Sequence, residues 1–129
     1  MSAAATVRAA ALARLRGDPA VAVNRIFDGA DARGTAPYAV LRDVTATDWG
    51  TKDRAGRELR LGITIRDEGE TPARAEALAG AAEAALLDLP RDLAGWRIAS
   101  AVPLRCAVVA EAQGRWAVLV DVRIRVLAA

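Results

Sequence analysis

Residues 116–126 read WAVLVDVRIRV, and an apolar side chain stands at every second position of this run. Asp121, Arg123 and Arg125 occupy positions between the apolar ones. Because successive side chains of a β-strand point to opposite faces of a sheet, this alternation predicts a strand with one buried face and one charged face. It is the strongest structural signal in the chain, and the rest of the fold is built outward from it.

A second strand is predicted at residues 58–66, which read ELRLGITIR and alternate in the same way. Residues 38–47 precede it and are rich in the β-branched and aromatic side chains that favour strands. The two runs are separated by the polar, glycine-containing stretch 48–56. They therefore predict an antiparallel hairpin with a long tip.

The last hairpin is predicted to join residues 97–110 to the strand at 116–126. Gln113 and Gly114 lie between the two runs and suit a turn. Pro103 cannot donate a backbone hydrogen bond, so it indicates a bulge or an edge position in the first of these strands.

Two other stretches have apolar residues at the three-and-four spacing typical of helices. The first runs from Ala3 to Arg16, where Gly17 suits the C-terminal cap. The second follows Thr71, expected as the N-cap, and Pro72, expected as the first helical residue. Pro90 is expected to stop it.

The predicted fold is therefore α+β: a four-stranded, mostly antiparallel sheet made of two hairpins, with two helices packed on one face. Residues 1–129 are expected to form a single domain, since the length is ordinary for one domain and no low-complexity linker divides the chain. Residues 20–35 have no clean period, and only Ile26 and Phe27 are expected to enter the core from this stretch.

Composition excludes several kinds of function. The 129 residues contain no histidine and one cysteine, which removes the commonest general base, a disulfide within the chain and a multi-thiolate zinc site. The 18 basic and 16 acidic residues are interspersed, so no uncompensated basic cluster indicates nucleic-acid binding. No apolar run approaches the roughly 20 residues of a membrane span, and no secretory signal is evident. We expect a cytosolic protein.

No catalytic, cofactor-binding or metal-binding residue is predicted. Cys106 occupies an apolar position in mid-strand and has no histidine to activate it, so a buried structural cysteine is expected. The acids Asp67, Glu68 and Glu70 could ligate a divalent cation, but they lack the spacing of a calcium loop. A turn before a helix N-terminus accounts for them. These features favour a binding or assembly protein over an enzyme.

Two groups of residues are candidates for partner binding. Trp49, Lys52, Asp53 and Arg54 lie in the polar hairpin tip, and tryptophan and arginine are common anchors of protein interfaces. The alternative is that Trp49 folds back on its own domain. The second group is Arg123 and Arg125, on the charged face of the last strand. That face is either completed by a neighbouring chain or simply solvated.

The order of several short motifs resembles the small tail-terminator, or tail-completion, proteins of long-tailed phages. The resemblance is strongest to the versions found in bacterial gene transfer agents, which are domesticated phage particles. It covers nearly the whole chain, apart from a short stretch after Val23. It is carried by the segments DPAV 18–21, APYAVL 36–41, TATDWGTK 45–52, LRL 59–61, GETPAR 69–74 and DVRIRV 121–126.

This resemblance implies a structural protein of the virion, without cofactors. The expected assembly is a homo-hexameric ring that caps the tail tube and joins it to the head-side connector, or stopper, protein. DNA would only pass through the lumen, and no membrane is involved. The protein would be cytoplasmic during assembly and then part of the particle at the tail–head junction. The alternative function is a small cytosolic ligand-binding or enzymatic domain with a pocket between the helices and the sheet.

Overall fold

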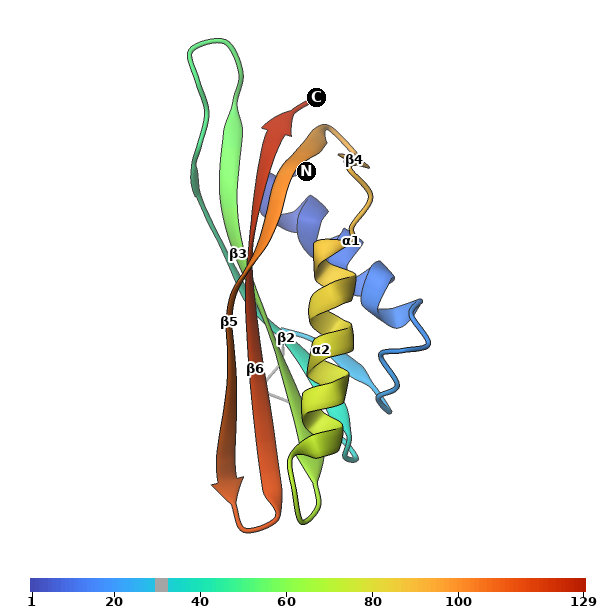
Figure 1. The fold of residues 1–129 in the computed structure, drawn as a ribbon. Coiled ribbons are helices and arrows are strands. Elements are labelled where there is room, and N and C mark those ends of the chain that lie inside the picture. Colours follow the sequence, from blue (N-terminus) through green and yellow to red (C-terminus); the bar gives the residue numbers. More distant parts are fainter. Residues whose placement is uncertain (30–32) are drawn as a thin grey trace.

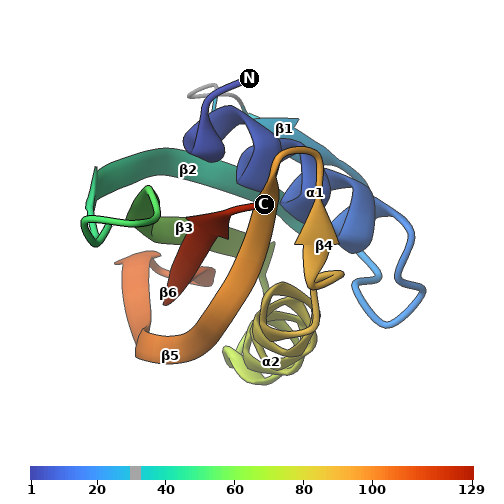
Figure 2. The same cartoon turned by 90° about the horizontal axis from the view of Figure 1, so that it is seen from above.

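A computed structural model of the chain describes residues 1–29 and 33–129 and has two helices on one face of a curled sheet (Figures 1 and 2). The elements are α1 (Ala3–Arg16), β1 (Ile26–Asp28), β2 (Tyr38–Asp48), β3 (Gly56–Glu68), α2 (Ala73–Leu87), β4 (Asp92–Leu93), β5 (Trp96–Ala112) and β6 (Arg115–Ala128). The strand order is β1-β2-β3-β6-β5-β4. The α+β class and the two helices are confirmed.

The predicted number of strands is wrong, because the sheet has six strands and not four. The four long strands are those of the two predicted hairpins, and β3 and β6 pair antiparallel in the middle of the sheet. The two additional strands are short and lie at the edges. β1 pairs in parallel with β2, and β4 pairs with the start of β5. Strands of two or three residues are too short for an alternating pattern to reveal them.

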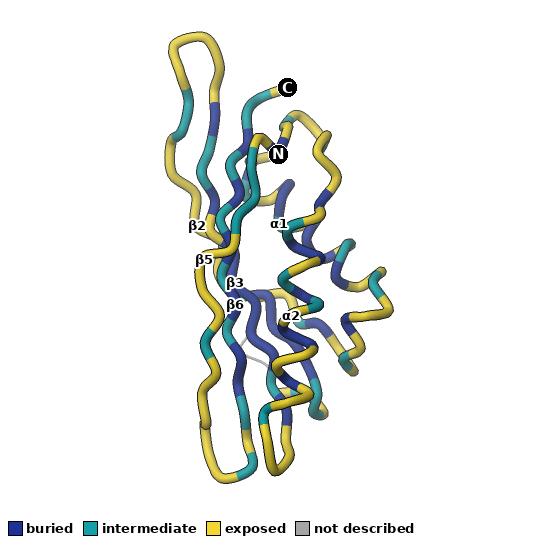
Figure 3. Tube along the Cα trace, in the orientation of Figure 1, coloured by how far each residue is buried: buried dark blue, intermediate teal, exposed yellow. Residues whose placement is uncertain are grey.

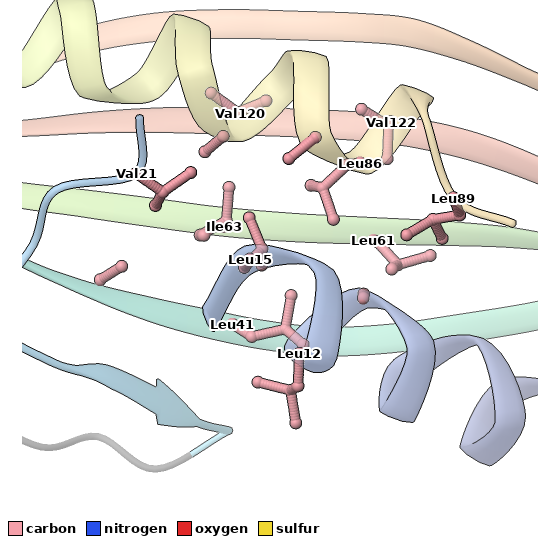
Figure 4. Close-up of a cluster of buried hydrophobic side chains, with 14 of the residues drawn as sticks. Leu12, Leu15, Val21, Leu41, Leu61, Ile63, Leu86, Leu89, Val120 and Val122 are labelled. Atoms are coloured by element: carbon pink, nitrogen blue, oxygen red, sulfur yellow. The ribbon is translucent and has the colours of Figure 1, made fainter. Parts of the chain in front are cut away.

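The core lies between the sheet and the helices (Figure 4). The inward-facing residues of β3 and β6 are almost wholly buried, as their alternation predicts: Leu59, Leu61, Ile63, Ile65, Val118, Val120, Val122 and Ile124. Leu15 of α1 and Leu86 of α2 pack against this layer. The small side chains of Ala75, Ala79 and Ala82 are also fully buried, which lets α2 lie close to the sheet.

The helix bounds agree with the sequence better at α1 than at α2. α1 begins after Ser2, whose hydroxyl accepts a hydrogen bond from the Ala5 amide at 3.1 Å, and it ends at Gly17. The prediction that Thr71 caps α2 is wrong. The N-cap is Pro72, and the Thr71 hydroxyl accepts only a long 3.4 Å hydrogen bond from the Ala73 amide. The turn before α2 is one residue longer than the sequence signal suggests.

Two side chains expected in the core are more exposed than predicted. Cys106 is exposed, because β5 lies beyond the strands that α2 covers most closely, and the tube in Figure 3 is exposed along most of this strand. Trp116 is only partly buried at the start of β6, where its indole N–H donates to the carbonyl oxygen of Gly69 at 3.1 Å. The expectation of register irregularity at Pro103 is confirmed by a shift between Pro103 and Arg105.

Candidate assembly surfaces: the outer sheet face and the hairpin tip

The face of the sheet opposite the helices, here called the outer face, is covered by arginines and carboxylates from four strands. At its centre Asp121 of β6 accepts from Arg42 of β2 at 2.9 Å and from Arg105 of β5 at 3.2 Å. Arg42 reaches Asp121 across Gly62 of β3. A Cβ atom at Gly62 would lie 2.4 Å from Nη2 of Arg42, so the missing side chain makes room for this ion pair.

A second charged group on the outer face includes both predicted arginines. Arg125 Nε donates to Glu58 Oε1 at 2.9 Å, while Arg123 Nε lies 4.0 Å from the same oxygen. Arg60 is directly opposite Arg123 in the pairing of β3 with β6. Like charges in directly opposite positions of a sheet are destabilising by themselves. The arrangement is therefore costly for an isolated domain.

Arginines outnumber carboxylates on this face. Arg42 and Arg105 pair with Asp121, Arg123 and Arg125 pair with Glu58, and Arg66 pairs with Glu111 at 2.9 Å. Nε of Arg42 and Nε of Arg123 are buried and have no hydrogen-bond partner in the described part of the chain. The outer face therefore carries an excess of positive charge, although these two nitrogen atoms are themselves out of reach of another molecule.

The hairpin tip between β2 and β3 projects beyond the rest of the sheet (Figure 1). Backbone hydrogen bonds continue into it, from the Trp49 amide to the Gly56 carbonyl at 3.0 Å and from the Thr51 amide to the Arg54 carbonyl at 2.8 Å. The tip therefore has a defined turn. Lys52, Asp53 and Arg54 are exposed at its end.

The structure brings Trp49 together with the outer face and separates it from the other tip residues. The guanidinium of Arg125 lies over the Trp49 ring, 5.2 Å from its centroid, and the residue is half-buried. Trp49, Arg125, Glu58 and Arg123 thus form one cluster at the base of the projecting hairpin. Glu58 was not among the predicted site residues, although the alternation of residues 58–66 places it on the charged face.

A polar cleft of about 490 Å³ lies near the opposite end of the sheet from the hairpin tip. Its lining includes the Arg66–Glu111 ion pair and Trp116. Asp67, also in the lining, is buried and accepts hydrogen bonds from Arg74 at 2.7 and 2.6 Å. These bonds hold the pKa of the Asp67 carboxyl below its usual value, against the opposing effect of burial. The carboxyl is therefore a structural anion, not a general acid.

The described residues contain no group of three acidic or cysteine side chains that could hold a metal ion. The space between the helices and the sheet, where the alternative function requires a pocket, is filled by side chains such as Leu15, Leu61 and Leu86. None of the helices in the described residues is long and apolar enough to span a membrane.

The family model described as "Tail completion protein gp17" matches residues 9–127. The chain belongs to this family. The tail completion protein is also similar to a chain in a solved structure titled "Virion of native gene transfer agent (GTA) particle". The similarity covers 99% of this chain and 100% of that chain, with 25% sequence identity and a TM-score of 0.81. A comparison with curated proteins gave no match. The resemblance inferred from the sequence is confirmed: this is a structural component of a phage-like tail and not an enzyme.

Proposed function

We propose that this tail completion protein caps the tail tube as a hexameric ring and joins the tail to the head-side connector. The observation that carries the proposal is the similarity over both whole chains to a component of a gene transfer agent virion. A fold shared over 99% of this chain and 100% of that chain favours a shared role in the particle. The chain would be cytoplasmic until it is incorporated.

The ring contacts are assigned to the strand edges and the outer face. The outer face carries the opposed arginines Arg60 and Arg123 and a shortage of carboxylates. Exposed ion pairs contribute only about 0–1 kcal/mol each, so this charge pattern adds little to the stability of a lone domain. It becomes favourable where a neighbouring copy supplies negative charge.

The hairpin tip is assigned to axial contacts with the tail tube protein or the connector. The tip is the part of the sheet that projects furthest, and Lys52, Asp53 and Arg54 are exposed there. Trp49 is fixed by Arg125 at the base of the hairpin, so the exposed residues are presented on a supported arm. A supported arm loses less conformational entropy on binding than a free loop does.

The lumen is expected to let DNA pass without holding it. A net charge of +2 on 129 residues supplies little counterion release, which dominates the affinity of proteins for duplex DNA. Tight phosphate contacts would also oppose the sliding that packaging and ejection require.

The test is removal of the gene from the strain that makes the particles, followed by electron microscopy. We expect DNA-filled heads and separate tails, and restoration of joined particles when the wild-type gene is supplied again. Normal joined particles made without the protein would refute the proposal.

A further inference from the structure

One edge of the sheet carries an unusual amount of exposed apolar surface. β4 pairs with β5 only at Trp96 and Arg97, and within the described residues no strand covers the outer edge of β5 from Ala99 to Ala112. Leu104, Val108 and Val109 on this strand are 41%, 44% and 42% exposed. At the usual rise per residue the open edge is about 45 Å long. A long apolar edge of this kind templates pairing with another strand.

The opposite edge of the sheet is also incomplete. β1 covers β2 only between Ala39 and Leu41, and the Arg8 side chain donates to the carbonyl oxygens of Leu41 and Arg42. From Asp43 to Asp48, β2 has no further strand partner among the residues that the structure describes. Each side of the sheet therefore has one long strand, β2 or β5, that its short edge strand covers only in part.

The directions of these two strands match. β2, β3, β6 and β5 are linked by three successive antiparallel pairings, so β2 and β5 run in opposite directions. Copies around a ring all have the same orientation relative to the ring axis. Where β5 of one copy meets β2 of the next, the two strands are consequently antiparallel, the more stable way to pair.

Among the described residues, the unpaired charges beside the β5 edge are acidic and those beside β1 are basic, whereas the β2 segment 43–48 itself carries Asp43 and Asp48. Glu83 and Glu76 of α2 lie on the β5 side, near Cys106. Partial burial is the main cause that raises the pKa of the Cys106 thiol, and the negative charges of these two glutamates raise it further. Neither glutamate has an ion-pair partner in the described residues. On the β1–β2 side, Arg16 donates to the Ile26 carbonyl, and Arg25 stacks over the Phe27 ring at 4.9 Å. Neither arginine is within ion-pair distance of a described carboxylate.

We propose that the open edge of β5 pairs antiparallel with residues 43–48 of β2 in a second copy, so that the sheet continues from copy to copy around the ring. This inference rests on the proposed ring and identifies its contact. Pairing β5 with β5 of another copy is the competing arrangement. It would bring the glutamates of both copies together and leave both β2 edges open.

Cys106 makes the proposal testable, because it is the only cysteine in the chain and lies on β5. Cys106 pairs with Val120 and so lies on the helix-facing side of the sheet. Three variants each place one cysteine on the same side of the β2 edge: Val44→Cys, Ala46→Cys and Asp48→Cys. Alternate residues of a strand are about 7 Å apart, so these positions sample the edge evenly. Ala77→Cys is the matched control, on the exposed side of α2. Purified particles are treated with a mild oxidant or with a flexible bismaleimide and analysed by denaturing electrophoresis.

At least one β2-edge variant is expected to give a ladder of linked chains that continues beyond the dimer. The wild type and Ala77→Cys are expected to stay monomeric. A wild-type dimer through Cys106 would establish β5–β5 pairing and overturn the inference, as would the absence of ladders from all three variants in particles that contain the chain. Particles that lack the chain altogether would instead refute the proposed function.

A second measurement does not depend on variants that assemble. In wild-type particles some backbone amides within residues 99–112 are expected to exchange hydrogen more slowly than in the free chain, because the edge-facing amides of the stretch that pairs with residues 43–48 gain a partner across the new strand pair. Equal exchange in the two states would overturn the inference.

Discussion

Replacing Asp67 by asparagine tests the link between the end of β3 and the first turn of α2. The Asp67 side chain is 5% exposed and accepts from Arg74 Nε at 2.7 Å, from Arg74 Nη2 at 2.6 Å and from the Glu68 amide at 2.8 Å. Asparagine keeps the shape of the side chain but removes its charge, and it turns an NH₂ group toward the Arg74 donors or the Glu68 amide.

Charge-assisted hydrogen bonds contribute about 1.5–3 kcal/mol each. The Arg74 side chain is 61% exposed, so water replaces part of what it loses. We therefore expect Asp67→Asn to lower the free energy of unfolding by about 2 kcal/mol, which for a domain of this size lowers the Tm by roughly 6–10 °C. Glu68→Gln is the matched control. Glu68 is exposed and lies 3.8 Å from Arg115, so its loss should change stability by less than about 0.5 kcal/mol.

The same variant should change the pH dependence of stability. The pKa of Asp67 is lower in the folded chain than in the unfolded chain, so its contribution is complete above the unfolded-state pKa, about 3.9, and is lost as the pH falls through the folded-state value. The difference between wild type and Asp67→Asn should shrink as the pH is lowered below about 4. Urea unfolding followed by circular dichroism at several pH values measures this. A variant with wild-type stability at pH 7, or a difference independent of pH, would refute the reasoning.

Three further predictions follow from the assembly surfaces. In Arg123→Glu the new carboxylate faces Arg60 across the strand pair, so the free energy of unfolding should stay within about 1 kcal/mol of the wild-type value. Ring assembly, measured by native mass spectrometry, should weaken. Unchanged assembly would show that the outer face takes no part in the ring contact. Shortening Asp48–Gly56 to a two-residue turn should leave the fold and the ring intact but give particles whose heads and tails fail to join. If micrographs show a normal share of joined heads and tails, the tip serves only to connect β2 to β3. Binding to free duplex DNA, followed by fluorescence anisotropy, should be weak and disappear as salt is raised. Nanomolar affinity at physiological salt would contradict a lumen that only lets DNA pass.

The long elements could be predicted from the sequence because each repeats a pattern over many residues. The expected bounds of the first helix agree with α1 at Ala3–Arg16, and the inward residues of β3 are buried as their alternation indicates. Alternation shows which side chains share a face, but it does not show whether another element covers that face. Cys106 was misassigned for this reason, since β5 extends past the area that α2 covers.

The candidate site depends on strand register, which the sequence alone did not provide. Trp49 and Arg125 are far apart in the chain. They meet because Glu58 pairs with Arg125 in the register of β3 and β6, while Arg57 pairs with Asp48, the neighbour of Trp49. β1 and β4 were missed because two or three residues cannot display a period, so the open edges beside them could not be located.

A three-dimensional reconstruction of the wild-type particle at the head–tail junction tests the central claim most directly. The account predicts one hexameric ring of this chain at the head-proximal end of the tail tube, with the β2–β3 hairpin tips directed along the tube axis. Density for the chain elsewhere in the particle, or a ring at the junction built without it, would contradict the account.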